Sequence, residues 1–125
     1  MKKKVIIAKD APAAVGSYSH ACKFGNLVFS CGTLGLDPVS GNLPEGVEAQ
    51  AHLCFKNLEA ALKAGGSCLD NCVKVTVYVK NMSDFAKVNE IYKQYIKEPF
   101  PARTCIEAAA LPKGALVEIE AVAHT

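Results

Sequence analysis

The clearest pattern in the chain is an alternation of apolar and polar residues over 73–80, where four valines alternate with lysine, threonine and tyrosine. Successive side chains of a strand point to opposite faces of a sheet, so this period of two predicts a strand. A short strand is also expected at Val5–Ala8. The segments 21–24 and 27–31, which flank the turn dipeptide Gly25–Asn26, are predicted to form a hairpin.

Two other segments repeat their apolar residues at the spacing of a helix. The first begins at Val47 and should stop at Gly65–Gly66, since glycine favours helix ends. The second should begin with Ser83 as its N-cap and end before Pro99. Residues 32–46 are rich in glycine and proline and are expected to be a loop. The apolar positions of the two helices are Val47, Ala51, Cys54, Leu58, Ala61 and Leu62, then Phe85, Val88, Tyr92, Tyr95 and Ile96.

The C-terminal stretch concentrates the candidate chemistry. Strands at 102–108 and 116–123, joined by a turn at 111–114, are predicted to form a second hairpin. Arg103, Cys105 and Glu107 would share one face of the first strand, and Glu118 and Glu120 one face of the second. Such a cluster could bind a small carboxylate and hold a water beside it. Charges that alternate along a strand usually form a solvated face of an antiparallel sheet, and that alternative stays open.

Arg103 favours the site interpretation. It is the one arginine among fourteen basic residues, and its planar fork suits two-point recognition of a carboxylate better than a lysine does. Pro101, two residues earlier, should stiffen the approach to the strand.

Taken in order, these elements predict one α+β domain spanning residues 1–125, with about six strands in a mixed sheet. Two helices can cover only one face of such a sheet. The strands at 27–31 and 116–123 are apolar on both sides, so the uncovered face is expected to pack against another subunit. Clefts between the subunits of a homo-oligomer would then be natural ligand sites.

Composition narrows the function classes. A net charge of +2 with scattered lysines lacks the basic footprint of a nucleic-acid-binding protein. No apolar run is long enough to span a membrane, and Val5–Ala8 is too short for the core of a signal peptide, so a cytoplasmic location is expected. The six cysteines lack zinc-type spacing; we expect no metal site and interpret most of them as small buried hydrophobic residues.

Several motifs along the chain form a specific set. Pro101-Ala102-Arg103 stands together with residues 111–123 near the C-terminus. Residues 11–16 with Tyr18 and the dipeptide Cys31-Gly32 precede them, and residues 73–79 and 85–92, the latter including Asn89, complete the set. In these motifs, which cover nearly the whole chain, the sequence resembles the Rid (YjgF) family of reactive imine deaminases.

This resemblance implies a chorismate-mutase-like fold with both helices on one sheet face, a homotrimer and ligand sites in the clefts between subunits. It also implies hydrolysis of reactive enamines and imines, such as 2-aminoacrylate and 2-iminobutanoate, to 2-keto acids and ammonia. The family enzymes use no cofactor and act on products of pyridoxal-phosphate enzymes such as dehydratases.

Matched positions imply roles for individual residues. Arg103 would bind the substrate carboxylate, Glu118 would position or protonate at the attacking water, and Tyr18 would close the pocket. The backbone of Cys105 would hold the imine nitrogen. Cys31, Gly32 and Asn89 are further substrate-binding candidates, and His20 is expected to be a surface or loop residue rather than a base.

One departure from the family pattern keeps an alternative open. Cys31-Gly32-Thr33 stands where deaminating relatives commonly have Ser-Gly-Gln. The same cleft could therefore capture 2-keto acids or related carboxylates without turnover. RNA cleavage, reported for some relatives, is disfavoured by the charge balance and by the lack of a basic stripe with interleaved aromatic residues.

Overall fold

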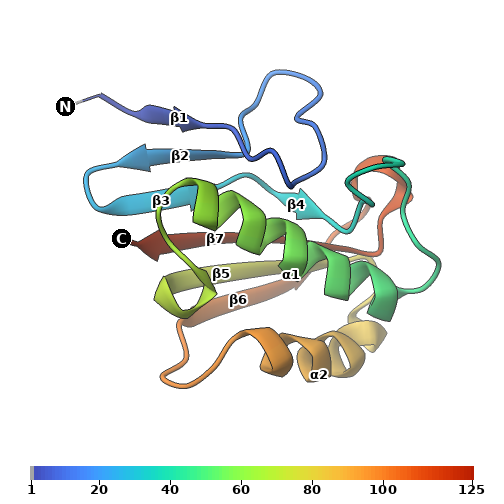
Figure 1. Cartoon of the computed structure of the whole chain (residues 1–125). Helices are drawn as coiled ribbons and strands as arrows, with labels where there is room; N and C mark the ends of the chain where they lie inside the picture. Colours follow the sequence, from blue (N-terminus) through green and yellow to red (C-terminus); the bar gives the residue numbers. More distant parts are fainter. Residues whose placement is uncertain (1) are drawn as a thin grey trace.

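The computed structural model describes residues 2–125, which form one mixed sheet of seven strands with two α-helices on one of its faces (Figure 1). The predicted α+β class and helix placement are confirmed, with one strand more than expected. The strands are β1 Lys4–Ile6, β2 Ala21–Phe24, β3 Leu27–Ser30, β4 Thr33–Leu34, β5 Cys72–Val79, β6 Ala102–Glu107 and β7 Val117–His124. The helices are α1 Val47–Ala64 and α2 Phe85–Tyr95, and short 3₁₀ turns lie at η1 Leu69–Asn71, η2 Met82–Asp84 and η3 Pro112–Gly114.

The strand order along the sheet is β1-β2-β3-β7-β5-β6, with β4 also paired to β7. The predicted hairpin of β2 and β3 is confirmed. The predicted C-terminal hairpin is wrong, because β5 lies between β6 and β7. β5 pairs parallel with β6 and antiparallel with β7, and α2 makes the crossover that a parallel pair requires.

The additional strand, β4, lies inside the segment that was expected to be loop. Only Thr33 and Leu34 pair, opposite Ile119 and Glu118 of β7. β3 pairs with the last residues of β7, so β3 and β4 share one partner and are separated by Cys31 and Gly32. A two-residue strand has no period of its own and cannot be recognised from alternation.

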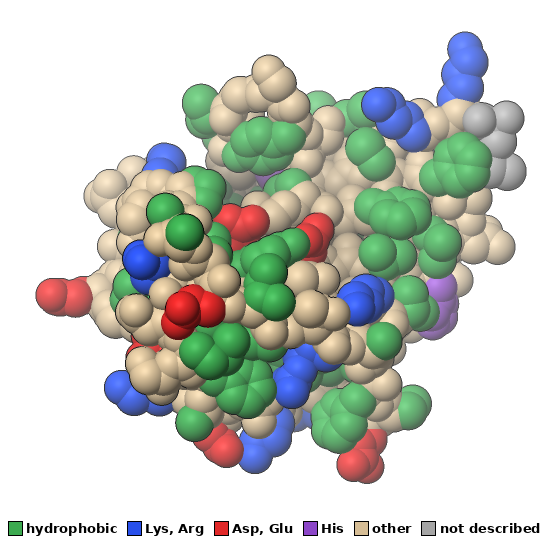
Figure 2. All heavy atoms as spheres, turned by 180° about the vertical axis from the view of Figure 1, so that it is seen from behind, with side chains coloured by type: hydrophobic (Ala, Val, Ile, Leu, Met, Phe, Trp, Pro, Cys, Tyr) green, Lys and Arg blue, Asp and Glu red, His purple; other side chains and the backbone are tan. Residues whose placement is uncertain are grey.

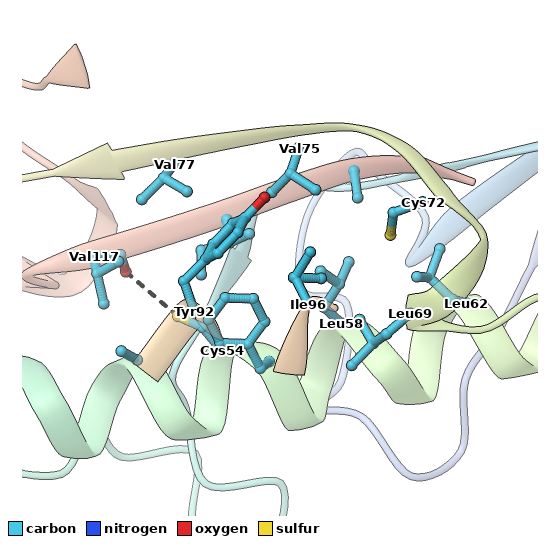
Figure 3. Close-up of a cluster of buried hydrophobic side chains, with 14 of the residues drawn as sticks. Cys54, Leu58, Leu62, Leu69, Cys72, Val75, Val77, Tyr92, Ile96 and Val117 are labelled. Carbon is cyan, nitrogen blue, oxygen red and sulfur yellow. Dashed lines mark hydrogen bonds between the residues drawn. The ribbon is translucent and has the colours of Figure 1, made fainter. Parts of the chain in front are cut away.

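The helices cover the sheet through the apolar stripes that the sequence predicted. Leu58 of α1 and Tyr92 of α2 lie against Val75 and Val77 of β5 (Figure 3), and all four side chains are at most 4% exposed. α1 ends at Gly65–Gly66, and Gly66 has the positive φ of 84° that glycine tolerates best. The predicted N-cap Ser83 lies instead in the turn η2, and Asp84 takes the cap position of α2.

The opposite face of the sheet carries no helix within residues 2–125, and it combines apolar side chains with charges (Figure 2). Val5, Phe24, Leu27, Phe29 and Ile106 are 38% to 51% exposed. We call this surface the uncovered face. Neither helix of the described part has the length and hydropathy needed to cross a bilayer.

Candidate functional site

Glu118 lies on the uncovered face, next to the break between β3 and β4. It is half-buried and pairs across the sheet with Tyr78 on one side and Leu34 on the other. Gly32 fills the break, and a Cβ at this position would lie 2.9 Å from the Glu118 carboxyl carbon. The absent side chain at position 32 therefore provides the space that the carboxylate occupies.

A cavity of about 510 Å³ opens beside this carboxylate. Four of the predicted site residues line it: Tyr18, Cys31, Gly32 and Glu118. They come from the N-terminal loop, the break after β3, and β7, so segments far apart in the sequence meet here. Lys113 of η3 lies on the same wall and is exposed.

The loop that carries Tyr18 is held by His20, which lies in this loop, one of the two environments expected for it, and is only 8% exposed. The Ala8 amide donates to His20 Nδ1 at 3.0 Å, which leaves Nε2 to donate to the Pro12 carbonyl at 2.7 Å. Both ring nitrogens are engaged with the main chain, so His20 acts as a structural tie. Tyr18 itself lines the cavity and is 51% exposed.

The surroundings of Glu118 favour the protonated form of its carboxyl group. Burial raises the pKa of Glu118, and the nearby carboxylate of Glu120 raises it further. The Tyr78 hydroxyl donates a short hydrogen bond to Glu120, which raises the pKa of Tyr78 to about 12. Burial likewise raises the pKa of Cys31, so this residue lines the wall as a neutral thiol.

Arg103 belongs to a second group of residues, around the edge strand β6. Its Nη1 donates to Asn89 Oδ1 of α2 at 2.7 Å. The guanidinium carbon lies 4.8 Å from the ring centre of Tyr92 and 5.3 Å from that of Phe85. These contacts hold the planar fork in place while it stays exposed beside a 400 Å³ hollow that Phe100 also lines.

Sequence reasoning missed the contribution of Phe85 and Tyr92 to this second group. Both were expected to be core residues of the α2 stripe, and Tyr92 is indeed buried. A signal was present, because Phe85, Asn89 and Tyr92 are spaced four and three residues apart and so share one face of the helix. Nothing in the local sequence showed that Arg103 would lie against that face.

Cys105 follows Arg103 on the same face of β6 and packs partly against the core. Burial raises the pKa of its thiol, opposed by the positive charge of Arg103. A neutral, half-buried thiol is a poor nucleophile.

Within one protomer the two groups do not meet. Arg103 pairs with Val75, whose other neighbour is Ala121, on the face that the helices cover. Glu118 pairs with Tyr78 on the uncovered face. The expectation that one hairpin would bring Arg103 and Glu118 together is therefore wrong. The structure divides the predicted site into an Arg103 group and a Glu118 group on opposite faces of the sheet.

The fold and these two groups define a class: a small α+β domain that presents an arginine fork and a half-buried glutamate beside open cavities. The chain belongs to the family described as endoribonuclease L-PSP, which matches residues 8–125. The resemblance to the Rid proteins is confirmed by a solved structure, RidA from the Antarctic bacterium Psychrobacter sp. PAMC 21119. It superposes with a TM-score of 0.95 at 45% identity, covering 98% of this chain and 99% of that one.

Curated relatives carry two kinds of name. The mouse 2-iminobutanoate/2-iminopropanoate deaminase is 48% identical over 97% of this chain and 90% of its own length. The RutC family protein PH0854 of Pyrococcus horikoshii is 44% identical over 98% of each chain. Imine deamination is thus an activity named for similar full-length proteins, within a family that also has other members.

Proposed function

We propose that this protein hydrolyses reactive 2-imino acids and their enamine tautomers, such as 2-iminobutanoate and 2-aminoacrylate, to 2-keto acids and ammonia. The observation that carries the proposal is the guanidinium of Arg103, held by Asn89 and two aromatic rings but left open to solvent. A pre-oriented fork of this kind suits a substrate carboxylate. The deaminase name of the mouse relative supports the same chemistry.

The reaction needs a fixed imine and a placed water more than a strong nucleophile. With its carboxylate on Arg103, the substrate would present the imine carbon to a water that donates a hydrogen bond to Glu118. Attack forms a carbon–oxygen bond, and the proton lost by the water reaches the nitrogen through Glu118. The hydroxyl of this carbinolamine then loses its proton, which Glu118 passes to the nitrogen, and cleavage of the carbon–nitrogen bond releases ammonia and leaves the keto acid. No group has to be oxidised or reduced.

The site would be completed by a second copy of the chain. We propose a homotrimer in which the edge strand β6 of one subunit lies against the uncovered face of the next, so that the Arg103 group of the first meets the Glu118 group of the second. The exposed apolar side chains of the uncovered face support this arrangement, since monomeric proteins rarely expose large apolar patches. Tyr18 would close the resulting cleft, and the Cys105 backbone would face the imine nitrogen.

The chemistry also sets the metabolic context of the proposal. Enamines and imines of this kind are released by pyridoxal-phosphate dehydratases acting on serine or threonine, so such enzymes are the proposed suppliers of substrate. We place the reaction in the cytoplasm, where the six unpaired cysteines would remain reduced.

The test measures keto-acid formation when the protein is added to a threonine dehydratase reaction in which spontaneous imine hydrolysis is limiting. Wild type should accelerate release, Arg103→Ala should lower kcat/KM about 100-fold, and Arg103→Lys should fall between them because it keeps charge but not the fork. Lys63→Ala, which removes a charge from an exposed i,i+4 pair on α1, is the matched control.

No acceleration by wild type would reject the deaminase proposal. If a 2-keto acid then bound to wild type but not to Arg103→Ala, the protein would be a carboxylate-binding module that uses the same cleft.

A further inference from the structure

A second carboxylate, that of Glu120, shares the uncovered face with Glu118 and is held by a tyrosine. The two glutamates are two residues apart on β7, so both side chains point to this face. Tyr78 of β5 lies directly opposite Glu118, but its hydroxyl reaches diagonally and donates to Glu120 Oε1. Diagonal neighbours on one face of an antiparallel pair are within reach of an aromatic side chain. The Tyr78 hydroxyl therefore fixes a second carboxylate beside the proposed base.

The hydrogen bond from Tyr78 is the main restraint on Glu120. Within residues 2–125 no cation forms an ion pair with this carboxylate, and no other side chain donates to it. Both partners are half-buried. A hydroxyl that donates to a carboxylate makes a charge-assisted bond, which is stronger than one between neutral groups. The same bond raises the pKa of Tyr78 to about 12, so the phenol stays a donor over the pH range in which a glutamate titrates.

Other titratable groups surround the two carboxylates. From β5, Lys74 lies on the same face, but its Nζ donates to Thr104 of β6 at 2.8 Å. Between β3 and β4, Cys31 is a neutral thiol, and Lys113 of η3 lines the same cavity as Glu118. β3, β4 and β6 present no titratable side chain to this face among the described residues. The remaining groups, in the cavity wall or at strand ends, are Tyr18, His20, Lys80 and His124.

We propose that Tyr78 is a positioning residue for imine hydrolysis, which holds the Glu120 carboxylate beside Glu118 and so makes Glu118 a stronger base toward the attacking water. This inference rests on the proposed function and gives a role to two side chains that its mechanism does not use. A negative charge nearby stabilises the protonated form of a carboxyl group, and a stronger base takes the proton of water more readily. Without the hydroxyl, Glu120 can turn toward solvent, where its charge acts on Glu118 from farther away.

The first experiment measures kcat and KM for 2-iminobutanoate as a function of pH. Tyr78→Phe keeps the ring and removes the hydroxyl. It should lower the plateau value of kcat about three- to tenfold, a small part of the roughly 100- to 10,000-fold that a general base contributes. KM should stay unchanged, and the acid limb should move to lower pH. Tyr95→Phe is the matched control, since it removes a hydroxyl that is bonded to His52 under the helices.

A double-mutant cycle shows whether the hydroxyl acts through Glu120. Glu120→Gln removes the charge, so Tyr78→Phe should have no further effect on kcat or on the acid limb in that background. Glu120→Asp, which keeps the charge on a shorter side chain, gives the answer if Tyr78→Phe does not fold. It should resemble Tyr78→Phe, because its carboxylate would fall short of the hydroxyl.

A second measurement does not need activity. The carboxyl ¹³C resonance of Glu118, assigned by its loss in Glu118→Gln, reports the midpoint of its titration. This midpoint should fall in Tyr78→Phe and stay unchanged in Tyr95→Phe. An unchanged or higher midpoint in folded Tyr78→Phe would overturn the inference, as would additive effects of Tyr78→Phe and Glu120→Gln.

The two measurements separate the proposals. Wild-type hydrolysis of 2-iminobutanoate with equal kcat in Tyr78→Phe would overturn the positioning role and leave the deaminase proposal standing. Absence of wild-type activity would reject the proposed function, and the Glu118 midpoint would then still report whether Tyr78 acts on this carboxyl group.

Discussion

Arg103 and Glu118 occupy opposite faces of one sheet, and a single strand, β5, separates the strands that carry them. A site that uses both side chains must therefore combine two chains. Mixing experiments can test this requirement directly. Arg103→Ala and Glu118→Gln should each be inactive alone, but after joint refolding at equal amounts about one subunit interface in four should combine an intact arginine with an intact glutamate.

The expected activity of the mixture is thus about a quarter of wild type, measured as keto-acid release per chain after the mixed oligomer is purified. A mixture of Arg103→Ala with an Arg103→Ala, Glu118→Gln double variant is the control and should stay inactive. If the first mixture also stayed inactive while mixed oligomers formed, both residues would have to act within one chain or not together.

Asn89 is expected to position Arg103 through the hydrogen bond from Nη1. Asn89→Ala should raise KM about three- to tenfold, because the loss of one exposed positioning hydrogen bond weakens binding by about 0.5–1.5 kcal/mol. Asn89→Asp should raise KM further, because a carboxylate at this position would pair with Arg103 and compete with the substrate. Steady-state kinetics over a range of salt would distinguish the variants, since only the aspartate effect should weaken as salt increases.

Gly32 is expected to matter for activity and not for stability. An added Cβ would meet only the far end of the flexible Glu118 side chain, which can swing away. Gly32→Ala should therefore lower kcat/KM about 100-fold with little change in Tm. Gly35→Ala is the contrasting variant, since its Cβ would lie 2.8 Å from the Gln50 Cα in the main chain of α1. It should lower Tm markedly; equal effects of both variants on Tm would contradict this division.

The raised pKa of Glu118 predicts the acid limb of the pH profile. If Glu118 must be ionised to accept a hydrogen bond from water, kcat/KM should fall at a higher pH than the ordinary pKa of a glutamate would give. Glu120→Gln removes the neighbouring negative charge and should move this limb to lower pH. Glu59→Gln on the exposed side of α1 is the control. An acid limb that does not move would show that another group sets it.

The raised pKa of Glu118 also means that its ionised form lowers the free energy of unfolding. A carboxyl group whose pKa is raised in the folded state contributes its stability below the ordinary pKa and loses it as the pH rises through the folded pKa. Glu118→Gln should consequently raise Tm at pH 7 and have less effect at pH 4. Thermal unfolding at the two pH values measures the difference, and a lower Tm at pH 7 would contradict the sign.

The elements with a strong period could be predicted from the sequence. Val75, Val77 and Val79 alternate so regularly that the β5 strand was evident, and the stripe from Val47 to Leu62 gave α1 with its end at Gly65. Strand neighbours could not be predicted in the same way. β6 and β7 follow each other in the chain and were expected to pair. The crossover through α2 instead places β6 next to β5, on the side away from β7.

The site shows a similar limit. The structure brings four of the candidate residues, Tyr18, Cys31, Gly32 and Glu118, to one cavity. Glu118 is separated from Arg103 because the two residues occupy opposite faces of the sheet. The register of β6 and β7 against β5 decides which face each residue takes. No local pattern contains that register.

β5 contributes only Tyr78, which donates a hydrogen bond to Glu120 beside Glu118, yet both groups take their positions from their pairing with this strand. Val75, Val77 and Val79 of β5 are buried under the helices, and a slip of one residue would turn all three outward, so the core fixes the register of β6 and β7 together. The relative positions of Arg103 and Glu118 are thus determined by apolar core residues that belong to neither group. Repacking these valines would change the alignment of the reacting groups before it unfolds the chain.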